Sequence, residues 1–445
     1  MYSNEFPFLN DLFTTINKRN ITYCVLRNYN TLPYDTNGSD IDIFIDPNDF
    51  HTFHKMIKEI AYKYNGEIIS VLTAPNVKDI AIMGIYKGSW WGIRFDTFTY
   101  IGTNDCMIFT NQFVINRIEL HNNIKVANYH DAVILAFIKE IIGARKYNKR
   151  YSDDAIKFFL EEKNTYKNEF LNVLPEDTVE KILVPLLLNQ IPFEQEISKT
   201  LFTGYRKKDF TTKKILFFYE LFLINFYKFK RLLVTPGFSV TFLGTDGSGK
   251  STIIEKIVPL LENPLHNEIL YSHMRPNMIP NIGELFGKKI TESEIIEPHA
   301  AKPSGFVGSL MRLGYYSFDY IIGYWKIVHV KLAQKTTVWI FDRYYYDYLI
   351  DPKRARINLP SWVIKGVGLF IPKPDLILCL GTKPEIIHSR KPELPFDEVV
   401  KQVNKLKDFS NNEKKAIWID TGKSLDESVN ETLETIKSKM ASRYN

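Results

Sequence analysis

A run of small residues and glycines near the middle of the chain has the composition of a phosphate-binding loop. Residues 244–251, Gly-Thr-Asp-Gly-Ser-Gly-Lys-Ser, fit the pattern G-x-x-x-x-G-K-[ST] without a departure. Glycines let successive backbone N–H groups converge on phosphate oxygens, and the N-terminus of a following helix adds a favourable potential. The flanks agree, because Phe238–Leu243 predicts a strand before the loop and Thr252–Glu255 predicts a helix after it.

The side chains of this loop have separate tasks in phosphoryl transfer. Lys250 would bridge the β- and γ-phosphates of ATP, and Ser251 would give its hydroxyl to Mg²⁺. Downstream, the apolar run Val338–Phe341 ends in Asp342, as is typical of a carboxylate that reaches the same Mg²⁺ through water. ATP and Mg²⁺ are therefore the predicted cofactors. The residues predicted to hold the nucleotide are Gly244, Asp246, Gly247, Ser248, Gly249, Lys250, Ser251 and Thr252.

A second group of carboxylates lies near the N-terminus. Asp40 and Asp42 are two residues apart on a predicted strand, so their side chains share one face, about 7 Å apart along the chain. Asp96 lies on another predicted strand, Ile93–Tyr100. Three converging aspartates suit two-metal nucleotidyl transfer, so Mg²⁺ or Mn²⁺ is expected there. The alternative is a scaffold or acceptor-recognition domain whose site is vestigial.

The elements that position these residues follow from periodicity. Apolar spacing and turn residues predict helices, short strands and one long helical stretch from His130 to about Gln190. Strands alternating with helices after Pro236 indicate a parallel α/β sheet. The other expected elements are helices Phe8–Arg19 and Phe50–Tyr64 and strands Ile21–Leu26, Ile41–Ile45, Leu376–Leu380 and Ile417–Ile419.

Length and composition limit the class of protein. A chain of 445 residues exceeds what one core usually serves, so two domains are expected. The three cysteines lie far apart, match no metal-ligand spacing and favour a reducing cytoplasm. The N-terminal residues do not resemble a signal peptide, and no apolar run is long enough to span a membrane. A cytoplasmic protein is therefore predicted.

The basic charge of the chain is concentrated in one segment. Residues 206–231 hold eight basic and two acidic side chains, and eight minus two equals the whole net charge of +6. Generic nucleic-acid binding is therefore not expected. Within this segment Ile215–Phe229 predicts a helix with a wide apolar face. It suits peripheral contact with an anionic membrane at its inner face. The favoured alternative is a helix buried between two domains, which would account for its aromatics.

The residues from about Phe238 to Asn445 resemble the thymidylate-kinase-like nucleoside monophosphate kinases. The resemblance rests on the loop at 244–251, on Asp342-Arg343-Tyr344 and on Arg390-Lys391 at the place of the basic lid. It implies that Arg343 grips the phosphate of the acceptor and that Arg390 stabilises the transferring group. A planar, permanently charged guanidinium suits both tasks.

The acceptor side departs from that family. Where thymidylate kinases carry Arg-Glu-Pro, this chain has His273-Met274-Arg275-Pro276, and a basic cluster with Arg354 and Arg356 follows the tyrosine-rich run. The candidate acceptor-binding residues are therefore His273, Arg275, Arg343, Arg354 and Arg356, although Arg354 and Arg356 could equally form a solvated turn. This variant resembles kinase-like proteins of bacterial surface-polysaccharide gene clusters. Asp319-Tyr320 stands where the family carries an Asp-Arg pair.

Residues 5–160 resemble the polymerase-β-like nucleotidyltransferase superfamily. The resemblance rests on Asp40, Asp42 and Asp96 and on the strand that leads to Arg27. Active members place Gly-Ser about ten residues before Asp-x-Asp, where this chain has Arg27-Asn28. Arg27 would therefore contact the triphosphate, or the domain no longer transfers nucleotides.

These observations predict an α/β fold with three parts. Residues 1–130 form an α+β nucleotidyltransferase-like domain, 131–235 a helical extension with a basic aromatic linker helix, and 236–445 a P-loop kinase domain with a parallel sheet. The predicted function is an ATP-dependent kinase acting on a small phosphorylated or sugar-containing acceptor in surface-polysaccharide or sugar-nucleotide metabolism. The alternatives are a thymidylate kinase and a nucleotide-binding switch without turnover. The acceptor and the oligomeric state stay open.

Overall fold

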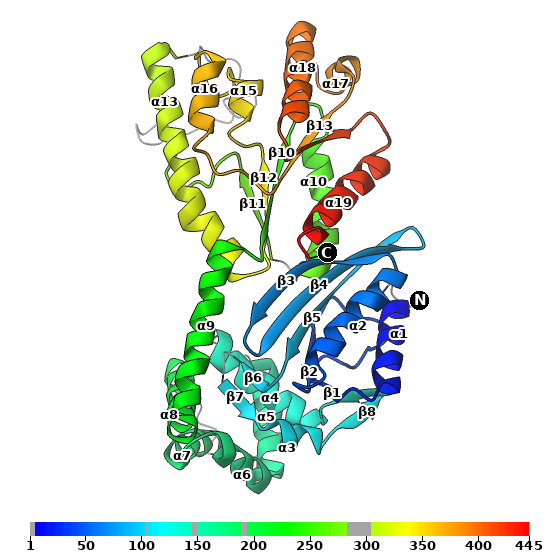
Figure 1. The fold of residues 1–445 in the computed structure, drawn as a ribbon, viewed down its shortest axis with the longest axis vertical. Coiled ribbons are helices and arrows are strands. Elements are labelled where there is room, and N and C mark those ends of the chain that lie inside the picture. The colour runs from blue at the N-terminus through cyan, green and yellow to red at the C-terminus, as the bar shows by residue number, and fades with distance from the viewer. Residues whose placement is uncertain are drawn as a thin grey trace. The chain divides into compact units, whose positions relative to one another are not determined.

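The chain divides into two compact units. The computed structural model describes residues 5–103, 106–144, 149–187, 194–266, 268–282 and 304–444. One unit comprises Met1–Phe229 and the other Lys230–Asn445 (Figure 1). The division falls inside helix α9 (Ile215–Leu233), a few residues before the predicted boundary at 235. The three-part division predicted from the sequence stays a prediction.

The N-terminal unit is built on a mixed, seven-stranded sheet of order β3-β4-β5-β2-β1-β9-β8. β2 and β5 are parallel, whereas β3, β4 and β5 form an antiparallel meander. All five residues of β2 are buried, so its Asp42 is held inside the unit. The strands are β1 (Tyr23–Val25), β2 (Ile41–Ile45), β3 (Gly66–Ala74), β4 (Val77–Tyr86), β5 (Ser89–Phe98), β8 (Glu119–His121) and β9 (Ile124–Val126), with β6 (Ile101–Thr103) and β7 (Cys106–Phe109) in a separate pair.

Helices complete the N-terminal unit. The expected helices near the N-terminus form α1 and α2, which pack together beside the sheet (Figure 1). The prediction of a helical stretch after His130 is confirmed where the chain is described; residues 145–148 and 188–190 lie outside the described part. The helices are α1 (Phe6–Lys18), α2 (Phe50–Lys63), α3 (Asn111–Ile115), α4 (Tyr129–Ala144), α5 (Lys149–Glu161), α6 (Lys163–Val173), α7 (Glu176–Leu187) and α8 (Glu194–Lys213).

The C-terminal unit contains the predicted parallel sheet. Its five strands run in the order β11-β12-β10-β13-β14, and every neighbouring pair is parallel. β10 and β12 lie side by side, so the phosphate loop after β10 and Asp342 at the end of β12 meet at one edge of the sheet. The strands are β10 (Phe238–Leu243), β11 (Ile269–His273), β12 (Val338–Asp342), β13 (Leu376–Gly381) and β14 (Ala416–Asp420).

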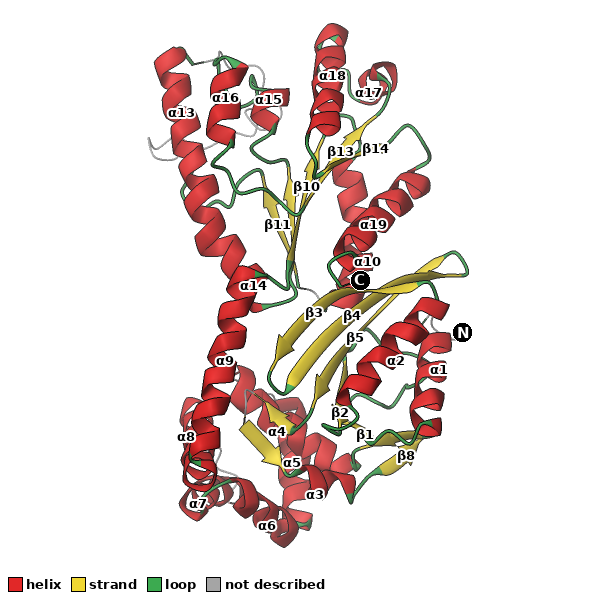
Figure 2. Cartoon of the chain, in the orientation of Figure 1, coloured by secondary structure: helices red, strands yellow, loops and turns green. Residues whose placement is uncertain are grey.

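Helices flank this sheet on both sides, with α13 and α14 on one side and α10 with α19 on the other (Figure 2). α13, η1 and α14 follow one another without a break, and η1 is a π-helix, a form often found near functional sites. The helices are α10 (Lys250–Leu265), α13 (Phe306–Phe318), η1 (Asp319–His329), α14 (Val330–Gln334), α15 (Asp347–Ile350), α16 (Ser361–Gly368), α17 (Pro384–Arg390), α18 (Phe396–Asn412) and α19 (Leu425–Ala441).

Helix α9 forms as predicted, but burial does not explain its aromatic residues. Ile224 is its one buried residue, and Phe218, Phe222 and Phe229 are each more than half exposed. The expectation that burial accounts for the aromatics is therefore wrong for most of this helix. None of the described helices is long and apolar enough to cross a membrane.

Candidate functional site

The phosphate loop has the backbone that its glycines predict. Gly247 and Gly249 have φ of +82° and +85°, a left-handed conformation that side chains rarely adopt. A Cβ at Gly247 would also lie 2.8 Å from the carbonyl oxygen of Ile387. Helix α10 begins at Lys250, so the positive end of its dipole faces the loop. The loop therefore has the shape of an anion site.

Lys250 lies inside this loop. Its Nζ donates to the carbonyl oxygens of Gly244 and Thr245 at 2.8 and 2.9 Å. Burial, and then the neighbouring Arg343 cation, lower the pKa of Lys250 to about 7. Phosphates at the loop would supply the negative charge that favours the ammonium form.

Several buried polar atoms around the loop have no hydrogen-bond partner among the described residues. They are Oγ1 of Thr245, Oγ of Ser248 and Oδ1 of Asp342. Buried polar atoms are rarely left unsatisfied in folded proteins, so this edge of the sheet is suited to a polar ligand. The exposed Ser251 at the start of α10 lies where its hydroxyl can reach a bound cation. These residues fit Mg²⁺ with a nucleotide.

Asp342 is held by a residue that the motif did not identify. The hydroxyl of Tyr271, on the neighbouring strand β11, donates to Oδ2 of Asp342 at 3.0 Å. Oδ1 of Asp342 is left without a partner, as described above. Tyr271 therefore fixes the orientation of the carboxylate while one oxygen stays available.

Arg343 joins three parts of the site. Its Nη1 donates to Oδ1 of Asp347 at 2.9 Å and its Nη2 to Oδ1 of Asp246 at 2.6 Å. Arg343 has φ of +70°, which is costly for a residue with a side chain and is concentrated at functional sites. The structure thus places this predicted acceptor ligand against the phosphate loop.

Asp246 and Arg354 extend this network. Nη2 of Arg354 donates to Oδ2 of Asp246, so Asp246 bridges Arg354 and Arg343. Burial acts to raise the pKa of Asp246, but the two arginines outweigh it and lower this pKa to about 2. Arg354 is therefore no freely solvated surface residue. Arg356 lies nearby in sequence, and its carbonyl oxygen accepts a hydrogen bond from the backbone N–H of Ser304.

Arg275, a predicted acceptor ligand, is hydrogen-bonded to other residues of the protein. Its Nη1 donates to Oδ2 of Asp319 at 2.9 Å and its Nη2 to Oδ1 of Asn281 at 2.8 Å. Its guanidinium carbon also lies 4.7 Å from the centre of the Tyr316 ring. His273 is exposed at the end of β11 beside Asp342. Of these two predicted acceptor ligands, Arg275 is thus bound to other residues of the protein, whereas His273 is exposed.

Arg390 lies beside a cavity next to the phosphate loop. Its Nη2 donates to the carbonyl oxygen of Thr421 at 2.9 Å. The cavity holds about 200 Å³ and reaches from Gly249 and Thr252 at the start of α10 to Lys423 and Leu425 after β14. The structure thus brings Arg390 near the loop, as predicted for the lid.

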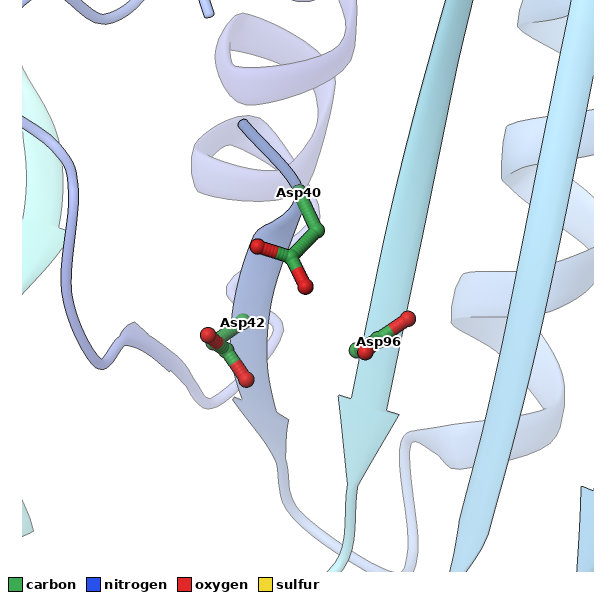
Figure 3. A group of neighbouring side chains, drawn as sticks. All are labelled: Asp40, Asp42 and Asp96. Carbon is green, nitrogen blue, oxygen red and sulfur yellow. The ribbon is translucent and has the colours of Figure 1, made fainter. Parts of the chain in front are cut away.

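The N-terminal carboxylates also come together. Asp40 and Asp42 on and beside β2 and Asp96 on β5 each offer an oxygen within 4.8 Å of the others (Figure 3). Asp42 and Asp96 are direct neighbours across the parallel strands. The predicted convergence of the three side chains is confirmed.

Three cations surround these carboxylates. Asp42 accepts hydrogen bonds from Nζ of Lys139 at 2.8 Å and from Nε of Arg27, and Nε of Arg94 donates to Oδ1 of Asp96 at 2.8 Å. Burial opposes ionisation, yet Lys139 and Arg27 lower the pKa of Asp42 to about 2. Burial and the Asp42 charge raise the pKa of Asp40. Hard oxygen donors suit Mg²⁺ or Mn²⁺, but protein cations already bind two of the three carboxylates.

A fourth carboxylate was missed. Asp79 on β4 lies opposite Asp96 in the antiparallel register and is 3.4 Å from Nη2 of Arg94. Burial and the charge of Asp96 raise the pKa of Asp79 to about 8. No spacing in the sequence could indicate this residue, because only the pairing of two long strands brings it to the cluster.

Comparison with known proteins covers the C-terminal unit. Residues 242–432 match the thymidylate kinase family model. The C-terminal unit is therefore a thymidylate-kinase-like P-loop domain of the α/β class, as predicted. The matched residues leave out the N-terminal unit, whose resemblance to nucleotidyltransferases stays a prediction.

Two known proteins are similar to part of this chain. A curated protein of Sulfurisphaera tokodaii described as "Probable thymidylate kinase" is 24% identical over 211 residues, which span 46% of this chain and 83% of that protein. A solved thymidylate kinase from Ehrlichia chaffeensis aligns at 16% identity with a TM-score of 0.32, over 45% of this chain and 98% of that one.

Proposed function

We propose that this chain is an ATP-dependent phosphotransferase that acts on a small phosphorylated or sugar-containing acceptor in surface-polysaccharide or sugar-nucleotide metabolism. The proposal rests mainly on the phosphate loop. Lys250 and Ser248 of this loop, together with Asp342 at the end of β12, place buried polar atoms at one edge of the sheet. The family match at 242–432 supports a nucleotide kinase. The altered acceptor side supports an acceptor other than thymidylate.

The residues of the loop have distinct roles in this proposal. ATP supplies the phosphoryl group and Mg²⁺ neutralises its charge. Lys250 and the loop N–H groups hold the phosphates, while Ser251 and Asp342 hold the cation. The cavity beside Arg390 suits the nucleoside, and the Arg390 guanidinium lies at its edge, where it can stabilise charge on the transferring group.

Arg343 and Arg354 are the proposed ligands of the acceptor's phosphate. Both guanidiniums bind Asp246, as two arginines would bind a phosphate group. An incoming phosphate can therefore take over donors that are already oriented. Arg275 contributes less in this proposal because Asp319 and Asn281 occupy its donors.

Two rival functions remain distinct from this one. A thymidylate kinase would share the whole ATP site and differ in the acceptor alone. A nucleotide-binding switch would bind ATP without turnover, and a lid arginine such as Arg390 would then have no task. The hydrogen bond from Tyr271 to Asp342 supports an enzyme, because it orients this carboxylate for a bound cation.

The acceptor can be found by incubating the full chain with isotope-labelled ATP, Mg²⁺ and a panel of sugar phosphates, sugars and nucleoside monophosphates, with mass spectrometry of the products. We expect a labelled sugar or sugar phosphate, with dTMP a poor substrate. A kcat/KM for dTMP of about 10⁴ M⁻¹s⁻¹ or higher would instead establish the thymidylate kinase. ATP binding without any labelled product would favour the switch.

A second candidate function belongs to the N-terminal unit. Three carboxylate oxygens within 4.8 Å of one another favour a divalent-metal site of the kind that nucleotidyl transfer requires. We propose Mg²⁺ or Mn²⁺ there, held by Asp40, Asp42 and Asp96. The rival is a vestigial site in which Arg27 and Lys139 replace the metal charge.

Asp40 offers the cleanest test of this metal site. Among the described residues no side chain donates a hydrogen bond to Asp40, whereas a change at Asp42 would leave Arg27 and Lys139 unpaired. Asp40→Asn should therefore keep the fold but abolish a Mn²⁺-dependent rise in the unfolding temperature of the full chain without nucleotide. Asp342→Asn serves as the control and should retain that rise. A wild-type midpoint that ignores millimolar Mn²⁺ would establish the vestigial site.

A further inference from the structure

Helix α9 carries an exposed apolar stripe along one face. Seven residues fall within an arc of about 100° when placed at 100° per residue. All seven are exposed, from 49% for Phe226 to 86% for Ile215. The stripe comprises Ile215, Phe218, Tyr219, Phe222, Phe226, Phe229 and Leu233.

The opposite face of α9 is the one that packs on the N-terminal unit. Ile224, half a turn around from the stripe, is buried, and Ile224 and Glu220 line a cavity together with α8 residues. The stripe extends over about 27 Å of helix, at 1.5 Å per residue. Contiguous exposed apolar surface of this kind marks an interaction site.

The charges around the stripe are mainly basic. The two acidic residues of 206–231, Asp209 and Glu220, both pair with Lys213, at 2.9 and 3.5 Å. Lys214, Lys228 and Lys230 are exposed. The segment therefore presents positive charge beside its apolar stripe, and its negative charge is neutralised internally.

We propose that α9 is a membrane-docking helix that lies in the plane of an anionic lipid surface. Phenylalanine, leucine and tyrosine enter the boundary between headgroups and acyl chains, while neighbouring lysines pair with anionic headgroups. The helix does not cross the bilayer, since no described helix is suited to do so. Such docking would hold the chain at the surface of an anionic membrane.

The basic charge beside the stripe also favours an anionic membrane over a second copy of the chain as its partner. Pairing two copies through the stripe would bring two equal sets of lysines to one interface, and like charges repel there. An anionic surface attracts the same lysines, at about 1 kcal/mol for each one near the headgroups.

The test is co-sedimentation of the full chain with vesicles of phosphatidylcholine alone or with about one third phosphatidylserine. We expect binding to the anionic vesicles and little to the neutral ones. The variant with Phe222→Ser and Phe226→Ser should bind the anionic vesicles at least about tenfold more weakly. Tyr62→Ser is the matched control, because Tyr62 is 81% exposed on α2, away from the stripe, and it should bind as the wild type does.

A charge variant completes the experiment. Replacing Lys214, Lys228 and Lys230 with glutamine should weaken binding to anionic vesicles about tenfold or more. Three exposed lysines elsewhere, Lys163, Lys365 and Lys407, give the control triple. Wild-type protein that stays in solution, or stripe variants that bind as well as wild type, would overturn the proposal. Dimers in sedimentation equilibrium that the serine variant converts to monomers would show that a second copy covers the stripe instead.

Discussion

Lys250→Ala and Asp342→Ala are each expected to slow phosphoryl transfer by on the order of 10²-fold or more while the protein stays folded. Lys250 brings positive charge to the phosphates from inside the loop, within 2.9 Å of two loop carbonyls. Among the described residues one carboxylate oxygen of Asp342 has no partner, while Tyr271 orients the other. Both side chains are buried, and alanine supplies neither the positive charge nor the carboxylate.

Turnover is measured with Mg-ATP and a verified acceptor, and folding by thermal unfolding of the same samples. Lys256→Ala is the matched control, because Lys256 is exposed on the same helix α10 and should leave turnover unchanged. Wild-type turnover in either site variant would refute the assignment of the ATP site.

Local patterns allowed the phosphate loop and the strand before Asp342 to be predicted. The loop at 244–251 and the strand that ends at Asp342 are contiguous runs whose composition reflects backbone geometry, so they are visible without knowledge of the fold. The convergence of Asp40, Asp42 and Asp96 was predictable for a similar reason, since Asp42 and Asp96 lie on strands β2 and β5 and Asp40 directly precedes β2.

The partners of these residues could not be predicted in the same way. Tyr271 reaches Asp342 across 71 positions of sequence, and Arg275 reaches Asp319 across 44. Neither pair leaves a spacing signal, because sheet register and helix packing decide the contact. Because Arg275 is bound to Asp319, we expect it to stabilise the fold and not to bind the acceptor.

Some elements were missed because their patterns are irregular. Strand β3 alternates poorly between buried and exposed residues, and its pairing with β4 shifts between Ile68 and Ser70. Such a bulge disturbs the period-two signal on which strand prediction depends. The π-helical turns of η1 also lack a distinctive composition, since the same residues would suit an α-helix.

Asp319→Ala is expected to destabilise the C-terminal unit by about 3–5 kcal/mol. Asp319 is fully buried, and its carboxylate accepts hydrogen bonds from Arg275 and from the backbone N–H groups of Asn277, Met278 and Ile279. Its loss would leave three backbone donors without this acceptor and the buried Arg275 guanidinium without its counter-ion. The free energy of unfolding is measured by urea titration.

Arg275→Met separates the structural role of this arginine from acceptor binding. Methionine keeps an apolar stem over the Tyr316 ring, and Asp319 would still accept its three backbone hydrogen bonds. We therefore expect a stability loss smaller than that of Asp319→Ala and a nearly unchanged KM for the acceptor. Arg354→Met is the matched comparison, because Arg354 binds Asp246 beside the phosphate loop and should raise that KM when replaced. An acceptor KM that rises strongly in Arg275→Met at wild-type stability would mean that Arg275 leaves Asp319 to bind the acceptor, as the sequence alone had suggested.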